Sequence, residues 1–114
     1  MHLVASKILD FWFKKSKSIQ WFKKDNKYDN LIKNNFLHHH NAAINGDFIS
    51  WKKSPYESLA FIILLDQFSR NIYRNDHRSF MFDHISLDFC KYGINKSFEA
   101  KLKTNDHKLF YILP

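Results

Sequence analysis

An uninterrupted apolar run near the centre of the chain constrains the fold more than any other feature. Residues 59–65 read Leu-Ala-Phe-Ile-Ile-Leu-Leu, and a helix that is apolar on every side must be covered on every side. Ser54, Pro55 and Glu57 precede the run in the order of a capping box, with serine at the N-cap and proline at the first helical position. The sequence therefore predicts a central helix that begins at Pro55 and is surrounded by other helices.

Apolar residues recur at helical spacing through the rest of the chain, while turn residues are scarce. Only two glycines and two prolines occur among 114 residues, which leaves little turn chemistry for a sheet of many strands. We expect a first helix over residues 3–13 and a second from Asp25 or Asn26 to a left-handed stop at Gly46. Another is expected from Asn75 or Asp76 to a stop at Gly93. A weakly helical stretch over 97–102 and a last helix from Thr104 or Asn105 onwards complete the chain. The helix after Asp25 is expected to face the core with Tyr28, Leu31, Ile32, Phe36 and Ala43. The predicted fold class is all-α, in a single domain over residues 1–114.

The formal net charge of +7 would on its own suggest a nucleic-acid partner. Lysine supplies fifteen of the eighteen positive side chains, and the lysines occur singly or in pairs with no block of five or six. This distribution is typical of a generally solvated surface, and no nucleic-acid-binding motif accompanies it. We therefore disfavour nucleic acid as a partner.

The single cysteine and the short apolar runs indicate a reducing setting without membrane contact. Cys90 excludes an internal disulfide framework and follows Leu-Asp-Phe, a context typical of a buried helical thiol. Ser6, Lys7 and Asp10 interrupt the apolar residues of the N-terminus, so no signal peptide is expected. The run 59–65 is far shorter than the roughly 18 apolar residues that suggest a membrane span. We expect a cytoplasmic protein.

Five polar residues directly after the apolar run form the candidate site. At 100° per residue, Asp66, Gln67, Arg70, Asn71 and Arg74 fall within one arc of about 140°, provided that the helix stays regular. The same face is apolar one or two turns earlier. A face that begins in the core and ends polar is expected to lie at the rim of a cleft, where solvent reaches only part of it.

The three arginines of the chain all fall within residues 70–78. A guanidinium group offers a planar fork that matches carboxylate or phosphate, so arginine in a lysine-rich chain indicates positions where lysine would not serve. The competing interpretation is structural, because Asp66 and Arg70 form an i, i+4 pair that could simply tie the end of the helix. Asp83 is expected to be a partner for one of the arginines. Both interpretations stay open.

No sequence motif indicates a metal or cofactor site. Consecutive residues of a helix point about 100° apart, so His38, His39 and His40 cannot converge on one ion. The chain has no glycine-rich phosphate loop, no cysteine pair and no nucleophile elbow. We expect no metal and no cofactor. No reaction can be assigned, and a general base would have to be chosen between Asp66 and His40.

Several segments together resemble a known family. Residues 8–13 read Ile-Leu-Asp-Phe-Trp-Phe, residues 64–74 read Leu-Leu-Asp-Gln-Phe-Ser-Arg-Asn-Ile-Tyr-Arg, and residues 110–114 read Phe-Tyr-Ile-Leu-Pro. Through these segments the chain resembles, over nearly its whole length, the bacterial family catalogued as domain of unknown function 924. Ser69 stands where this family usually has proline, a departure expected to ease continuation of the helix. His40 falls at the family's recurring histidine position and joins the candidate ligand-binding residues.

The resemblance implies helical hairpins packed as a tetratricopeptide-like array, with no established activity. It also implies that family members run on for several more helices, so that this chain would be the N-terminal portion of a longer domain, truncated at the C-terminus. The last helix ends on an apolar group that nothing later in the chain covers, namely Phe110, Tyr111, Ile112 and Leu113. Such a face predicts self-association or a protein partner.

Two hypotheses for function follow. The first is a non-catalytic, helical-repeat-like module that binds a peptide or protein in a groove, which rests on analogy with the fold. The alternative is a small-molecule or anion-binding protein, with enzymatic activity left open, in which Arg70 and Arg74 hold an anionic group while Asp66, Gln67 and Asn71 orient it. The substitution Arg70→Lys separates the two, because only the anion site depends on the guanidinium fork.

Overall fold

Every regular element of the computed structural model, which describes residues 1–114, is a helix. The elements in chain order are α1 (Leu3–Leu9), the π-helical η1 (Asp10–Lys15), α2 (Ser18–Phe22), α3 (Asn26–Ile44), the 3-10 helix η2 (Ile49–Lys53), α4 (Pro55–Ile62), the π-helical η3 (Ile63–Gln67), α5 (Phe68–Ile72), α6 (Arg78–Met81), α7 (Asp83–Asn95), the 3-10 helix η4 (Phe98–Lys101) and α8 (Asn105–Ile112). The all-α prediction is confirmed. The tetratricopeptide-like arrangement stays a prediction.

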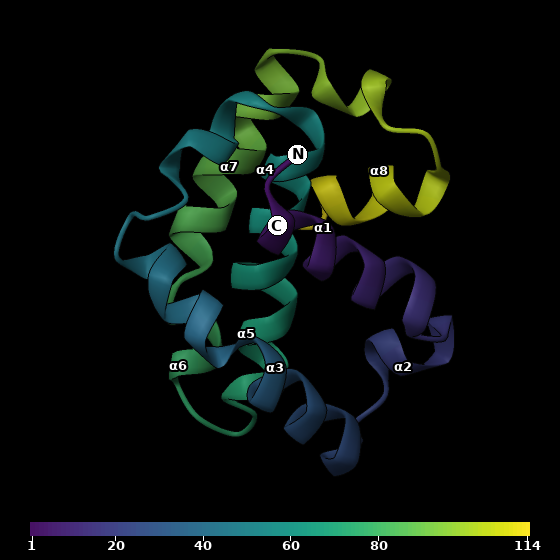
Figure 1. Ribbon diagram of the computed structural model, residues 1–114, viewed down its shortest axis with the longest axis vertical. Helices are drawn as coiled ribbons and strands as arrows, with labels where there is room; N and C mark the ends of the chain where they lie inside the picture. Colours follow the sequence, from purple (N-terminus) through teal and green to yellow (C-terminus); the bar gives the residue numbers. More distant parts are fainter.

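The central helix consists of α4, η3 and α5, which follow one another without a break over residues 55–72. Residues 59–65 are all buried. Figure 1 shows this helix upright in the middle, with α7 along one side, α1 and α8 on the other, and α3 crossing its lower end. The Phe61 and Phe89 rings stack 3.7 Å apart between α4 and α7. The prediction of a surrounded central helix is confirmed.

The predicted start of the central helix is confirmed, but the prediction of a capping box is wrong. Ser54 is the N-cap and Pro55 is the first helical residue, yet the Ser54 side chain accepts no hydrogen bond from the helix. Glu57 Oε2 instead accepts a hydrogen bond of 2.8 Å from the backbone N–H of His2. The carboxylate has a competing donor in His2, the residue that precedes α1, and it therefore ties the start of α1 to α4 instead of capping its own helix.

The long helix α3 begins and ends as predicted. The Asp25 side chain accepts hydrogen bonds from the backbone N–H groups of Lys27 and Tyr28, and Gly46 follows the helix with a φ of 88°. The predicted core-facing stripe is confirmed except at Leu31, whose exposed fraction is 48%. His40 is fully buried on the same face of the helix.

The helix predicted from Asn75 or Asp76 to Gly93 is two helices, and Gly93 does not end the second. The break falls between α6 and α7, and α7 runs through Gly93 to Asn95. A Cβ atom on Gly93 would lie 1.6 Å from the hydroxyl oxygen of Tyr111. The glycine therefore serves close packing of α8 against α7, and Ser97 takes the positive φ after the helix, at 60°.

The last helix is better covered than its sequence suggested. Thr104 caps α8 as predicted, with its hydroxyl accepting from the backbone N–H of His107 at 3.0 Å. Phe110 and Tyr111 are fully buried, so the prediction of an uncovered face is wrong for these two residues. They pack against other helices of the chain itself, where Tyr111 lies beside α7. Ile112 and Leu113 remain 50% and 44% exposed, and self-association through them stays a prediction.

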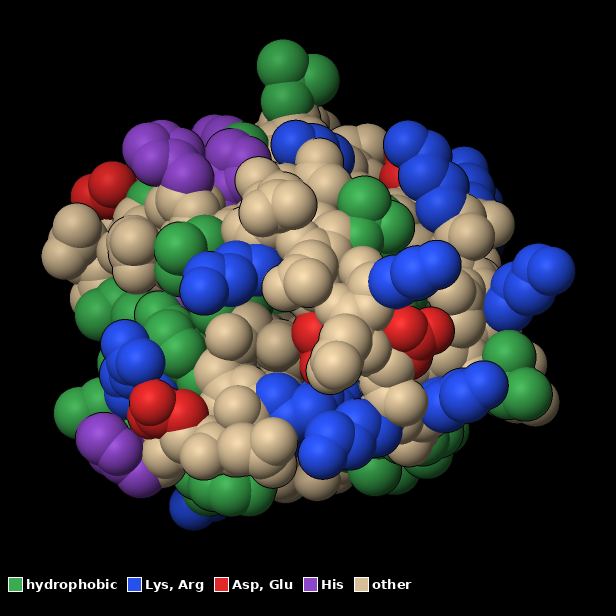
Figure 2. Space-filling model, turned by 90° about the horizontal axis from the view of Figure 1, so that it is seen from below, with side chains coloured by type: hydrophobic (Ala, Val, Ile, Leu, Met, Phe, Trp, Pro, Cys, Tyr) green, Lys and Arg blue, Asp and Glu red, His purple; other side chains and the backbone are tan.

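The surface carries charges of both signs. Figure 2 shows lysine and arginine side chains spread across one face, with acidic groups between them and apolar patches at the edge. Cys90 is buried, as its sequence context predicted. No helix has both the length and the apolar character that crossing a membrane would require.

Candidate functional site

The structure gathers five of the six candidate residues around one cleft of about 410 Å³. The helix does not stay regular, because it widens to a π-helix over residues 63–67 and ends at Ile72. The polar wall nevertheless holds together and consists of Asp66, Gln67, Arg70, Asn71 and Arg74. The opposite wall is apolar and consists of Trp21, Phe22 and Leu113.

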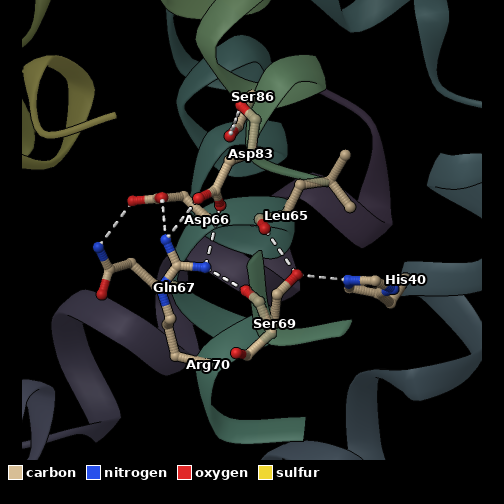
Figure 3. Close-up of polar contacts among 9 residues, drawn as sticks. His40, Leu65, Asp66, Gln67, Ser69, Arg70, Asp83 and Ser86 are labelled. Atoms are coloured by element: carbon tan, nitrogen blue, oxygen red, sulfur yellow. Dashed lines mark hydrogen bonds and ion pairs between the residues drawn. The ribbon is translucent and has the colours of Figure 1, made fainter. Parts of the chain in front are cut away.

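Arg70 is held by groups from three elements. Nη2 lies 3.3 Å from Asp66 Oδ1 and 3.1 Å from Asp83 Oδ2. Nη1 lies 2.9 Å from Asp83 Oδ1 and donates to the backbone carbonyl of Ser79. The guanidinium also sits 4.4 Å above the Phe80 ring. Figure 3 shows the contacts with Asp66 and Asp83 converging on the end of the Arg70 side chain. The prediction that Asp83 pairs with an arginine is confirmed, and the terminal nitrogens of Arg70 donate three hydrogen bonds within the chain.

Arg74 is held by a carboxylate that sequence reasoning missed. Its Nε and Nη2 donate to the two oxygens of Asp29 at 2.5 and 3.0 Å. Asn71 Nδ2 donates to the same carboxylate at 2.9 Å. The hydrogen bonds that Arg74 donates to Asp29 raise the pKa of Arg74. A lysine at position 74 could not reproduce this forked geometry.

Asp66 is a buried carboxyl group at the floor of the cleft. Burial raises the pKa of Asp66, and the nearby Arg70 guanidinium opposes that rise. Gln67 Nε2 donates to Asp66 Oδ2 at 2.9 Å. The network as a whole contains three carboxyl groups, those of Asp29, Asp66 and Asp83, and two guanidinium groups, those of Arg70 and Arg74. The cleft therefore carries no excess of positive charge.

His40, the sixth candidate, lies outside the cleft. Figure 3 shows it reaching Ser69 from the side of the helix opposite Gln67. Its Nε2 lies 2.7 Å from Ser69 Oγ, and that hydroxyl donates its only hydrogen to the Leu65 carbonyl at 2.6 Å. Ser69 must therefore accept from His40, which places the ring proton on Nε2. His40 Nδ1 is buried without a partner.

The buried ring of His40 predicts a loss of stability in mild acid. Burial lowers the pKa of His40 from 6.5 to about 4, so the unfolded chain takes up a proton at a pH where the folded chain does not. Between pH 7 and pH 5 this ring should lower the free energy of unfolding by about 2 kcal/mol. Urea denaturation of the wild type and His40→Gln at both pH values measures the difference, which the variant should lack.

A second histidine variant provides the control for that experiment. His84 is exposed on α7, and His84→Gln leaves His40 in place, so this variant should retain the loss of stability in acid that His40 causes. An equal loss of stability in His40→Gln and the wild type would contradict the burial of an uncharged ring at position 40.

The three consecutive histidines differ in their surroundings. His38 is exposed, whereas His40 is fully buried, as the angle between successive helical residues requires. No group of three or more His, Cys, Asp or Glu side chains is placed to hold a metal ion.

Comparisons with known proteins agree with the resemblance of the motifs. No curated protein matches the chain. The fold is similar to that of a protein of unknown function from Agrobacterium tumefaciens, with a TM-score of 0.91 and 32% sequence identity. The match covers 97% of this chain and 62% of that one, so this chain spans less than two thirds of the length of that relative. Residues 8–114 match the model of the family described as bacterial protein of unknown function (DUF924), and the chain therefore belongs to this family.

Proposed function

We propose that the chain is a non-catalytic binding module that holds a short stretch of polypeptide in the cleft between α2 and α5. The observation that carries this proposal is the state of the two arginines, which are already paired with carboxylates. The cleft is left with amide groups on one wall and apolar side chains on the other. We further propose that residues 1–114 act as one domain, supported by a single core of 25 buried apolar residues, and that it works in the cytoplasm.

The polar wall offers the donors and acceptors that a peptide group requires. Gln67 and Asn71 each use their amide nitrogen on a carboxylate, at 2.9 Å in both cases, which leaves Oε1 and Oδ1 as acceptors without a partner in the chain. Arg74 Nη1 makes no hydrogen bond within the chain and remains a donor. Peptide groups present one N–H donor and one carbonyl acceptor. The wall can therefore bind backbone in an extended segment.

The apolar wall offers a place for a side chain of the bound segment. Phe22 is 70% exposed and Leu113 is 44% exposed. Trp21 donates its indole N–H to the Trp12 carbonyl at 2.9 Å and packs against Phe110 at 4.9 Å. Trp21 is thus fixed in place before any partner arrives. Burial of exposed apolar surface of this kind would favour association by roughly 25 cal/mol per Å².

The same geometry argues against a small anion as the main ligand of this cleft. An anion on Arg70 would have to displace Asp66 or Asp83, and Arg74 offers it only Nη1, while three carboxyl groups would repel it. Arg70 therefore acts as a fixed strut that joins the central helix to α6 and α7. Its role is to shape the cleft.

Selection of peptides followed by titration tests the proposal. Random dodecapeptides are selected from a display library against the chain, and the tightest is titrated into variants by calorimetry. Asn71→Leu should weaken binding about tenfold, the value of one lost hydrogen bond and its unpaired partner. Arg70→Lys should change affinity by less than about threefold, since Arg70 donates its hydrogen bonds to groups of the chain and not to the peptide.

A matched control and a clear contrary result accompany this test. Asn30 is an exposed asparagine on α3, and Asn30→Leu should leave the affinity unchanged. Failure to select any peptide would contradict the proposal. So would a peptide whose affinity survives Asn71→Leu and collapses with Arg70→Lys, because that pattern belongs to an anion site.

A further inference from the structure

A second hollow, of about 310 Å³, lies on another part of the molecule, between α1, η1 and α3. Its size is at the lower end of the range for pockets that bind small organic molecules. Its floor is aromatic and its rim carries two lysines, Lys7 and Lys15. None of the residues of the polar cleft lines this pocket.

The floor consists of three rings in contact. Phe11 stacks on Tyr28 with centroids 5.8 Å apart and planes inclined by 20°. Phe36 meets Phe11 edge to face at 5.2 Å. The Lys7 ammonium lies 5.3 Å from the centre of the Phe36 ring, so one positive charge is held directly above this floor.

The hydroxyl groups of the pocket are satisfied by one another. Ser16 Oγ donates its hydrogen to the Phe11 carbonyl at 2.8 Å, and Tyr28 must therefore donate to Ser16 Oγ at 2.6 Å. Gln20 Oε1 accepts from the backbone N–H of Lys17 at 2.8 Å, which leaves the Gln20 amide nitrogen without a partner in the chain. The free donors at this pocket are thus two ammonium groups, the Gln20 amide and the second amide hydrogen of Asn35, whose first hydrogen is donated to the Leu31 carbonyl.

The charge of this pocket is the opposite of that of the polar cleft. No carboxylate lines it, and neither Lys7 nor Lys15 forms an ion pair within the chain. Phe11 and Lys15 both come from the π-helical η1, and π-helical turns are frequent at functional sites. Two unpaired cations above an apolar floor match a ligand with a flat apolar body and an anionic group.

We propose that this pocket binds a small organic anion with an aromatic body, such as an aryl carboxylate, sulfonate or phosphate. Phe11 and the half-exposed Leu31 contact the flat body of the ligand, above the buried rings of Tyr28 and Phe36. Lys7 and Lys15 pair with its anionic group, and Gln20 donates a hydrogen bond to it. This site is independent of the peptide cleft and does not rest on the function proposed for it.

Two fluorescent probes with the same rings test the proposal on the full chain. Anilinonaphthalene sulfonate carries an anionic group, whereas N-phenylnaphthylamine is neutral. The anionic probe should bind with one-to-one stoichiometry and about tenfold more tightly than the neutral one, since two partly exposed ion pairs together contribute about that factor. Raising the salt concentration should weaken only the anionic probe.

Variants separate the charge of the pocket from its shape. The double substitution Lys7→Met and Lys15→Met should remove the advantage of the anionic probe and leave the neutral one unchanged. Leu31→Trp, at the half-exposed edge of the pocket, should fill it and abolish binding of both probes. Lys33→Met, at an exposed lysine outside the pocket, serves as control and should change neither.

Circular dichroism melts confirm that each variant is folded before titration. Equal affinity of the anionic probe for the wild type and the double lysine variant would overturn the proposal. So would equal affinity of the two probes for the wild type, or the absence of one-to-one binding by the anionic probe.

Discussion

Replacement of Gly93 by alanine should lower the free energy of unfolding by about 3 kcal/mol. Helix propensity alone predicts the opposite, a gain of roughly 1 kcal/mol for alanine within a helix. The new Cβ would lie 1.6 Å from the Tyr111 hydroxyl oxygen and 2.4 Å from the ring carbon that bears it. Tyr111 is fully buried and bonded to Ser58 at 2.9 Å, so the ring has no free space into which it could move. Urea denaturation measures the change.

Two further variants decide whether the clash is the cause. Gly46 has a positive φ, but a Cβ atom added there would meet no other atom within 4 Å. Gly46→Ala should therefore lower the free energy of unfolding by about 1 kcal/mol, which is the backbone strain of alanine in the left-handed conformation. In a Tyr111→Leu background, Gly93→Ala should lower the free energy of unfolding far less than it does in the wild type. A large cost that persists without the tyrosine ring would show that another contact is responsible.

Replacement of Asp29 by alanine should cost about 3 kcal/mol, the lower end of the range for breaking a buried ion pair. The Asp29 carboxylate accepts two hydrogen bonds from Arg74 and one from Asn71, and its side chain is only 10% exposed. The substitution leaves those donors with no partner in the protein. Urea denaturation at neutral pH measures the loss, and the Arg74 side chain should become mobile.

An exposed aspartate provides the matched control. Asp47 follows α3, is exposed and forms no ion pair, so Asp47→Ala should change the free energy of unfolding by less than about 0.5 kcal/mol. If Asp29→Ala were equally harmless, Arg74 would not be fixed by this carboxylate. The cleft would then present a free guanidinium, as an anion site requires.

The polar wall could be predicted because it is a local pattern. Asp66, Gln67, Arg70 and Asn71 are close in sequence, and the helical period alone places them on one face. These side chains stay on one face even though residues 63–67 form a π-helical turn, which has no signature in the sequence. The partner carboxylate Asp29 could not be found in this way, because it lies 45 residues before Arg74.

A signal for the buried polar residues of α3 was nevertheless present. Ile32, Phe36 and His40 follow one another at intervals of four, which places His40 on the buried face. Asp29 precedes Ile32 by three residues on that same stripe, and a carboxylate in such a position must find a cationic partner. The periodicity of α3, taken with the cluster of arginines, would have indicated the pair.

The errors at Glu57 and Gly93 have a common physical cause. Both residues fit a local rule for the end of a helix, and both are used instead by a segment distant in sequence. Glu57 bonds to the backbone of His2, 55 residues away, and Gly93 receives the ring of Tyr111. Tertiary contacts of this kind override local signals and are visible only once the helices are packed.

The peptide proposal is tested most directly by nuclear magnetic resonance of the nitrogen-labelled chain during titration with the selected dodecapeptide. The side-chain amide signals of Gln67 and Asn71 and the indole signal of Trp21 should shift in a saturable manner, since these groups line the cleft. The signals of Lys52 and Asn95, which line a hollow on α7, should not move. Shifts confined to α7, with the amides of the cleft unchanged, would contradict the account.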